Sequence, residues 1–320
     1  MPSPEIRSVL VIHDRPEDFR AMLEARFAAL RFTFAGTPES VAPALAASNP
    51  DAVFSIKQAS FPAEAHRPAA AYPSVRWVQV GGSGYDHFLP WPRRDIKVSN
   101  CAGVLAPFLA ETVIAGILAL NGNFPRYAEQ QRQALWRPLA FRPLAGRTLL
   151  VVGLGAIGGH VACYAKAFGM TVLAIRRRGG AHPSVDEMHP PEALPELVAR
   201  ADVISLHVRL SEETRGMIGE PVFERCKPGA ILVNTARGPV VDEAALIAAL
   251  KSGRLAGAYL DVFESEPLPR ASPLWQLPNV LITPHASDNV VDWPLRLALL
   301  FADNLERWNA GQPLLNEIAI

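Results

Sequence analysis

The chain of 320 residues has few cysteines and no excess of charge of either sign. Its three cysteines, Cys101, Cys163 and Cys226, stand apart and form no Cys-x-x-Cys pair, which argues against a disulfide framework or structural zinc and favours a reducing compartment. Lysine plus arginine number 31, as do aspartate plus glutamate, so the formal net charge is +0. We therefore expect no metal site and no nucleic-acid partner.

The sequence also lacks a convincing membrane segment. The apolar run near the N-terminus is too short for a signal peptide. The longest apolar stretch, Ala102–Leu120, carries Pro107 and Glu111 in its first half, which favours a buried helix over a membrane span. We expect a cytoplasmic protein without membrane contact.

Short apolar runs alternate with helical patterns in two successive series. The runs of the first series are Ser8–His13, Asp51–Ile56, Arg76–Val80 and Ile96–Asn100, and those of the second begin at Thr148 and continue near residues 201–206, 230–235, 257–262 and 279–284. Such alternation is typical of parallel sheets covered by crossover helices. The prediction is an α/β protein with two doubly wound parallel-sheet domains.

The boundaries follow from the two series. We expect a dinucleotide-binding domain over residues 101–288 and a substrate domain over residues 1–100 and 289–320. A long helix from about Pro107 to Asn121 would link the series, and a last helix, roughly Asp292 to Trp308, would return to the first domain.

A glycine turn joins a strand to a helix at the start of the second series. The strand Thr148–Val152 enters Gly153-Leu-Gly155-Ala-Ile-Gly158, and a second strand follows at Thr171–Ile175. Gly153 suits a tight turn, Gly155 admits a pyrophosphate close to the backbone, and Gly158 allows the helix to pack on the strand. The predicted cofactor-binding residues here are Gly153, Gly155, Ala156, Ile157 and Gly158. The alternative is a strand–helix turn that binds nothing.

The carboxylate that usually follows such a second strand is absent. No Asp or Glu occurs from Thr171 to Val185, and the strand is followed by Arg176, Arg177 and Arg178. An acid at this point would hold the ribose hydroxyls of NAD, whereas guanidinium groups suit the 2′-phosphate of NADP. We therefore predict that NADP(H) is favoured over NAD(H). A solvated cluster is the alternative, because the chain uses arginine far more than lysine.

Three stretches late in the chain carry reactive side chains after strands. They contain Arg237, then Asp261 and Glu266, and finally His285. Groups just past the carboxyl ends of parallel strands converge on one edge of a sheet. His285 suits proton transfer at neutral pH, Glu266 would favour its imidazolium form, and Arg237 would grip a substrate carboxylate or carbonyl. These types fit the reduction of a 2-keto acid.

In this order and beside the glycine turn, the segments resemble the D-2-hydroxyacid dehydrogenase family over nearly the whole chain. The resemblance is carried by LAGRTLLVVGLGAIG, KPGAILVNTARG, LIAALKSGRLAGAYLDVFESEPLP and PNVLITPH, among others. It implies that Arg237, Glu266 and His285 are catalytic and that Asp261 lines the nicotinamide side. It also implies a flavodoxin-like and a Rossmann-like domain, closure of the cleft between them, and a homodimer.

Further site residues come from the same resemblance. Ser83 and Gly84 match the glycine loop that cradles the substrate carboxylate, and Thr235 and Ala236 fall beside the cofactor. Two interpretations do not depend on the resemblance: Lys57, just past a strand, faces either the cleft or solvent, and Trp136 and Trp275 are packing or dimer-contact residues.

Two departures from the family bear on the site. Arg209 stands where proline is common, so it either helps or disturbs 2′-phosphate binding. Ala286, Ser287 and Asp288 stand where many relatives have glycine, which leaves the local substrate contacts open.

The sequence therefore predicts an NADPH-preferring reductase of small 2-keto acids of the glyoxylate and hydroxypyruvate type. The alternatives are the same fold acting on a bulkier 2-hydroxy acid or on a formate- or phosphite-like anion, and a dinucleotide-sensing interaction protein.

Overall fold

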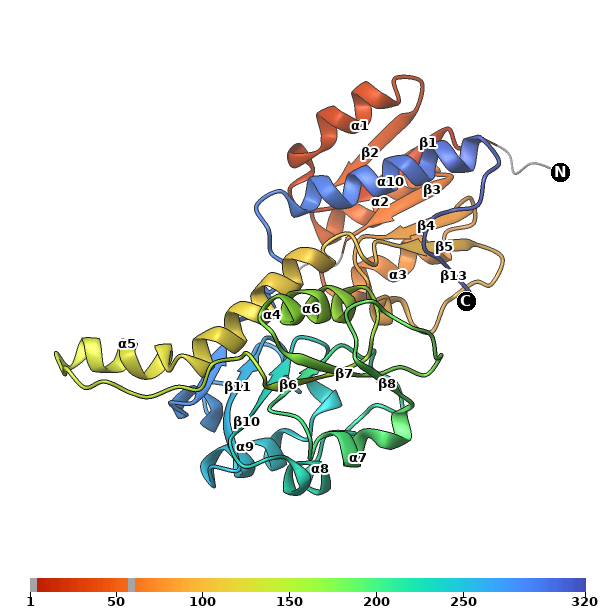
Figure 1. Ribbon diagram of the computed structural model, residues 1–320. Helices are drawn as coiled ribbons and strands as arrows, with labels where there is room; N and C mark the ends of the chain where they lie inside the picture. The colour runs from red at the N-terminus through yellow and green to blue at the C-terminus, as the bar shows by residue number, and fades with distance from the viewer. Residues whose placement is uncertain (1–4, 57–60) are drawn as a thin grey trace. The chain divides into compact units, whose positions relative to one another are not determined.

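The computed structural model describes residues 5–56 and 61–320 (Figure 1). The described chain forms two compact units, one from the residues up to Leu105 together with Val290–Ile320, the other from Ala106–Asn289. Lys57 lies outside the described residues. The roles that the sequence suggests for the two units remain predictions at this point.

The first unit is built on a six-stranded sheet in the order β13-β5-β4-β3-β1-β2. Its strands are β1 (Ser8–Ile12), β2 (Arg31–Ala35), β3 (Ala52–Ser55), β4 (Trp77–Val80), β5 (Lys97–Asn100) and β13 (Glu317–Ile318). Its helices are α1 (Arg20–Arg26), α2 (Val41–Ser48), α3 (Ala63–Ala71) and α10 (Trp293–Asn309). The five parallel strands follow the flavodoxin-like order, and β13 adds an antiparallel edge.

Apolar side chains fill both faces of this sheet, which is why strands such as β1 are buried along their whole length. On one face α10 packs its apolar side on the sheet, where the Phe301 ring stacks on Phe54 and Trp77 with centroids 4.7 and 5.2 Å apart. Figure 1 shows α10 lying across this face beside α1. Helices α2 and α3 contribute to the opposite core.

The second unit is built on a parallel seven-stranded sheet in the order β12-β11-β10-β9-β6-β7-β8. Its strands are β6 (Thr148–Val152), β7 (Thr171–Ile175), β8 (Glu187–His189), β9 (Val203–Leu206), β10 (Ala230–Asn234), β11 (Leu255–Leu260) and β12 (Val280–Ile282). Its helices are α4 (Ala106–Asn121), α5 (Phe124–Arg132), α6 (Ala156–Ala167), α7 (Leu194–Leu197), α8 (Glu220–Arg225) and α9 (Glu243–Lys251). This is the Rossmann order with a seventh strand added, and it reverses between β6 and β9.

Two helical layers cover this sheet. Helices α4 and α6 pack on one face, and α7, α8 and α9 on the other (Figure 1). Helix α4 approaches closely, because a Cβ atom at Gly116 would come within 2.4 Å of the Tyr259 ring. The long apolar stretch of the sequence is therefore a core helix whose inner face includes Val113 and Ile117.

The expected pair of parallel-sheet domains is confirmed. Within the described ranges no single helix is long and apolar enough to cross a membrane; only α4 and α5 taken together, bent by 61° at their junction, meet those length and composition limits. Some elements differ from the prediction, since β2, β8, β13 and α5 were not anticipated.

Candidate active site

In the turn after β6, each of the three glycine positions requires or tolerates glycine for a different physical reason. Gly153 has φ +99°, and a Cβ atom on it would come within 2.7 Å of the His207 carbonyl oxygen. A Cβ atom at Gly158 would come within 2.4 Å of the Gly153 carbonyl oxygen, so helix and strand meet there. A Cβ atom at Gly155 would meet nothing within 4 Å. Gly155 therefore leaves open space in front of the N-terminus of α6, where free amide groups favour an anion.

Two buried polar atoms lie past the ends of the neighbouring strands. Thr235 follows β10 and His207 follows β9, and Thr235 Oγ1 and His207 Nδ1 have no hydrogen-bond partner among the described residues. Burial lowers the pKa of His207 to about 3, which keeps its ring neutral at physiological pH. Buried polar atoms of this kind normally find a partner, so this edge fits a polar ligand such as a dinucleotide.

His207 was missing from the predicted site. His207 is the first residue after β9, at the end of the sequence ADVISLH. Polar residues also follow β10 and β11, and this shared position is the signal by which His207 could have been predicted. Its other ring nitrogen, Nε2, lies 2.8 Å from Ser205 Oγ.

The three arginines after β7 are exposed. The Arg176 amide donates to the His189 carbonyl at 3.0 Å, which extends the β7–β8 pairing to the first of them. Arg177 forms a surface ion pair of 3.4 Å with Glu213, while in the described parts of the chain no ion pair occupies Arg176 or Arg178. Arg209 is exposed as well, and its carbonyl accepts a bond from Thr214 Oγ1 at 2.7 Å.

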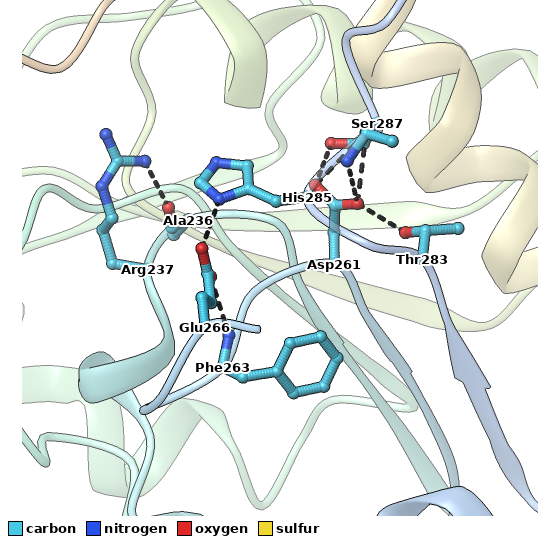
Figure 2. Close-up of polar contacts among 9 residues, drawn as sticks. Ala236, Arg237, Asp261, Phe263, Glu266, Thr283, His285 and Ser287 are labelled. Atoms are coloured by element: carbon cyan, nitrogen blue, oxygen red, sulfur yellow. Dashed lines mark hydrogen bonds and ion pairs between the residues drawn. The ribbon is translucent and has the colours of Figure 1, made fainter. Parts of the chain in front are cut away.

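Two of the predicted catalytic residues, His285 and Glu266, are paired directly through their side chains. His285 Nδ1 lies 2.8 Å from Glu266 Oε2, and Glu266 Oε1 accepts the Phe263 amide at 3.1 Å (Figure 2). The hydrogen bond to Glu266 raises the pKa of His285, which burial and Arg237 oppose. About 45% of the His285 side chain remains exposed, so its Nε2 edge is available to a ligand.

Asp261 holds the loop that carries His285. The carboxylate is buried and accepts bonds from the Ala286 amide at 2.8 Å and from Ser287 Oγ at 2.6 Å, and it also accepts the Thr283 hydroxyl (Figure 2). His285 itself has φ +51°, an unusual value for a residue with a side chain, and its amide donates to the Asp261 carbonyl at 2.9 Å. These bonds are made within the protein, so a contact of Asp261 with cofactor stays a prediction.

Arg237 is held by hydrogen bonds to residues at the end of β10. Asn234 Nδ2 donates to the Arg237 carbonyl at 3.1 Å, and Arg237 Nη1 donates to the Ala236 carbonyl at 2.7 Å. The next residue, Gly238, has no room for a side chain, because a Cβ atom there would lie 1.8 Å from the Phe263 carbonyl carbon. This close approach brings the loop of Arg237 against the loop of Glu266, and Figure 2 shows Arg237 beside the His285–Glu266 pair.

The remaining predicted residues divide between the two units. Ser83 and Gly84 follow β4 in the first unit, where Asn100 Nδ2 donates to the Ser83 carbonyl at 2.8 Å. Asp288 is in the second unit, and burial raises the pKa of its carboxyl while the nearby His285 opposes this. Trp275 donates from its indole nitrogen to the Pro269 carbonyl at 3.0 Å.

Comparison with known proteins identifies the family of the chain. The family model described as D-isomer specific 2-hydroxyacid dehydrogenase, NAD binding domain, matches residues 114–287. A glyoxylate reductase of Korarchaeum cryptofilum is 40% identical over 254 residues, which cover 76% of this chain and 75% of that protein. The chain belongs to the D-isomer specific 2-hydroxyacid dehydrogenase family. It is an NAD(P)-dependent D-2-hydroxyacid dehydrogenase.

Solved structures of the same family are similar over almost the whole length. A family protein from Aeromonas salmonicida is 36% identical with a TM-score of 0.87, and the match covers 98% of both chains. A D-isomer specific 2-hydroxyacid dehydrogenase from Xanthobacter autotrophicus, solved with NADPH and MES, is 31% identical with a TM-score of 0.82 and 97% coverage of both.

Proposed function

We propose that the protein reduces small 2-keto acids of the glyoxylate and hydroxypyruvate type to D-2-hydroxy acids and favours NADPH as the reductant. The observation that carries the proposal is the His285–Glu266 pair beside Arg237, past the ends of the Rossmann strands. The glyoxylate reductase of Korarchaeum cryptofilum supports the substrate class.

Proton delivery is assigned to His285. Its Nδ1 is engaged by Glu266, so Nε2 is the nitrogen that faces a substrate. A nicotinamide bound here would supply the hydride that the keto carbon needs, that is, one hydrogen nucleus with two electrons. His285 Nε2 gives its proton to the keto oxygen, so the C=O group becomes CH–OH and the imidazole is left neutral. Glu266 keeps the imidazolium populated before transfer, because it raises the pKa of His285.

Substrate orientation is assigned to Arg237 and to the loop of Ser83 and Gly84. A guanidinium group binds a carboxylate through two parallel N–H donors, which fixes the plane of a 2-keto acid. The loop of Ser83 and Gly84 is proposed as a further contact of the substrate. Because a small acid makes few contacts, its reaction depends on these groups holding it in the correct orientation.

Cofactor preference is assigned to the segment after β7. This segment offers exposed arginines and no carboxylate from Thr171 to Val185, so the ribose hydroxyls of NAD lack their usual acceptor there. The Xanthobacter autotrophicus relative was solved with NADPH, which supports the same choice. Gly153, Gly155, Ala156, Ile157, Gly158, Thr235 and Ala236 would hold the rest of the dinucleotide.

Association into a homodimer is part of the proposal. The segment after α4 exposes a group of large apolar side chains, with exposed fractions of 98% for Trp136, 62% for Phe141 and 61% for Phe124. Exposed apolar side chains gathered in one segment indicate a surface covered by another chain.

A kinetic panel tests the proposal. Initial rates are measured with NADPH and NADH, each against glyoxylate, hydroxypyruvate, pyruvate and an aromatic 2-keto acid. We expect the highest kcat/KM for glyoxylate or hydroxypyruvate with NADPH. A preference for NADH, or for the aromatic acid, would overturn the corresponding half of the proposal.

A further inference from the structure

Gly159 lies inside a helix, and its backbone conformation gives no obvious reason for a glycine at this position. It is the fourth residue of α6, and its φ is not in the left-handed region. Glycine destabilises a helix interior relative to alanine, so something else must favour it here. A Cβ atom at Gly159 would lie 3.2 Å from His182 Nε2, closer than most side-chain contacts. The absent side chain therefore makes room for the His182 imidazole against the first turns of α6.

The hydrogen bonds of His182 define which of its nitrogens is a donor. The Ser184 amide donates to His182 Nδ1 at 3.2 Å, so Nδ1 is the acceptor. In a neutral imidazole the other nitrogen then carries the hydrogen. The Val185 amide also donates to the His182 carbonyl at 3.1 Å, which fixes the backbone of the turn. His182 thus presents an Nε2–H group beside α6.

The loop that contains His182 begins with the three arginines. It leaves β7 at Arg176, whose amide is held by the His189 carbonyl, and it returns to α6 through the Asp186 carboxylate, which accepts Lys166 Nζ at 2.9 Å. Between these two anchors the His182 ring lies against α6, because the three atoms nearest to a Cβ atom at Gly159 would all belong to it. The loop therefore runs from the end of β7, past the first turns of α6 at Gly159, to the last turn of that helix at Lys166.

We propose that His182 is a specificity-determining residue for the 2′-phosphate of the dinucleotide. The inference rests on the proposed function, which places that phosphate at the end of β7. Arg176 and Arg178 would supply charge, and the His182 Nε2–H group would supply a directed donor from the side of α6. A phosphate monoester has three oxygens that accept several donors at once, so a donor on a second side completes the recognition.

Dinucleotide binding to the purified full-length protein tests this residue. The dissociation constants of NADPH and NADH are measured by quenching of tryptophan fluorescence for the wild type, Arg176→Ala, His182→Ala and His182→Gln. The glutamine amide reaches the position of Nε2 and keeps a donor there. His160→Ala, a change of the histidine within α6 itself, is the matched control, and circular dichroism checks that each variant is folded.

We expect His182→Ala to raise the dissociation constant of NADPH by about tenfold, the loss typical of one hydrogen bond to a charged group, and that of NADH by less than about twofold. His182→Gln is expected to recover most of this loss, and His160→Ala to change neither constant. Equal weakening of both dinucleotides by His182→Ala, or no weakening, overturns the inference. If Arg176→Ala still lowers NADPH selectivity in that case, the proposed cofactor preference stands without His182. If the wild type binds NADPH and NADH equally well, both the proposed NADPH preference and the role of His182 are overturned.

Discussion

At the scale of single residues, the site depends on one coupled pair. Glu266 is held by the Phe263 amide and holds His285 through Nδ1, so the proton donor has a fixed orientation and a raised pKa. Arg237 opposes that shift, because its positive charge disfavours a second cation nearby. The sequence allowed the three residue types to be predicted, since each follows a strand of the same sheet. The distance that joins His285 to Glu266 follows only from the structure.

Replacing the carboxylate tests this coupling. Because Glu266 raises the pKa of His285, the imidazolium form persists to higher pH in the wild type than in Glu266→Gln. We expect Glu266→Gln to lower kcat for glyoxylate reduction by about tenfold or more at pH 7.5 and to move the alkaline limb of its pH profile to lower pH. The pH dependence of kcat and kcat/KM measures this. An unmoved alkaline limb would show that Glu266 does not control the titration of His285.

At the scale of elements, loop contacts past the strand ends bring the site together. The loop after β10 meets the loop after β11 at Gly238 and Phe263, and Asp261 fixes the loop after β12 through the amides of Ala286 and Ser287. Neither contact has a periodic signal in the sequence. The departures at Ala286 and Ser287 are partly explained by this arrangement, because the Ser287 hydroxyl adds a bond to the Asp261 carboxylate.

The closeness of the two loops predicts a large effect of a single methyl group. A Cβ atom at Gly238 would overlap the Phe263 carbonyl, so Gly238→Ala must displace the loop of Arg237, the loop of Glu266, or both. We expect kcat/KM for glyoxylate to fall by about 10²-fold or more, as for other small misplacements of catalytic groups. Gly36→Ala is the control, because a Cβ atom there would meet nothing within 4 Å. Wild-type kinetics for Gly238→Ala would contradict the described geometry.

The elements themselves were predictable to different degrees. Long buried runs such as β1 and β6 stand out because both faces are apolar, and α9 is marked by the Asp242 cap, which accepts the Ala245 amide, and by Gly253 at φ +75°. Strand β2 has an exposed first residue and half-buried neighbours, and β8 and β13 have three and two residues. All three strands lie at sheet edges and depend on pairing with one neighbouring strand, so local composition does not reveal them.

At the scale of the whole molecule, the chain builds two units from different stretches of its sequence. The central residues 114–287 match the NAD-binding domain of the family, while residues from both ends of the chain build the other sheet. The return of the last helix was predictable, because too few strands follow it to form a further sheet. The identity of the substrate could not be predicted in the same way, because a small 2-keto acid is selected by side-chain positions that no motif specifies.

Self-association is the prediction at this scale. Trp136 is 98% exposed in the segment that follows α5, and burying such a ring against a partner chain would remove a large apolar area from water. We expect the wild type to sediment as a dimer and Trp136→Glu to shift it toward monomer in analytical ultracentrifugation. Val291→Glu, a change at a side chain that is 99% exposed elsewhere, should leave the dimer intact. A monomeric wild type would contradict the proposed homodimer.

The central claim is that His285 delivers the proton in a site where the dinucleotide binds independently of it. The most direct measurement compares His285→Ala with the wild type for turnover of glyoxylate with NADPH and for the dissociation constant of NADPH. The account predicts a fall in kcat of about 10²- to 10⁴-fold with a dissociation constant within about twofold of the wild type. Turnover that remains within a few fold of the wild type would contradict it.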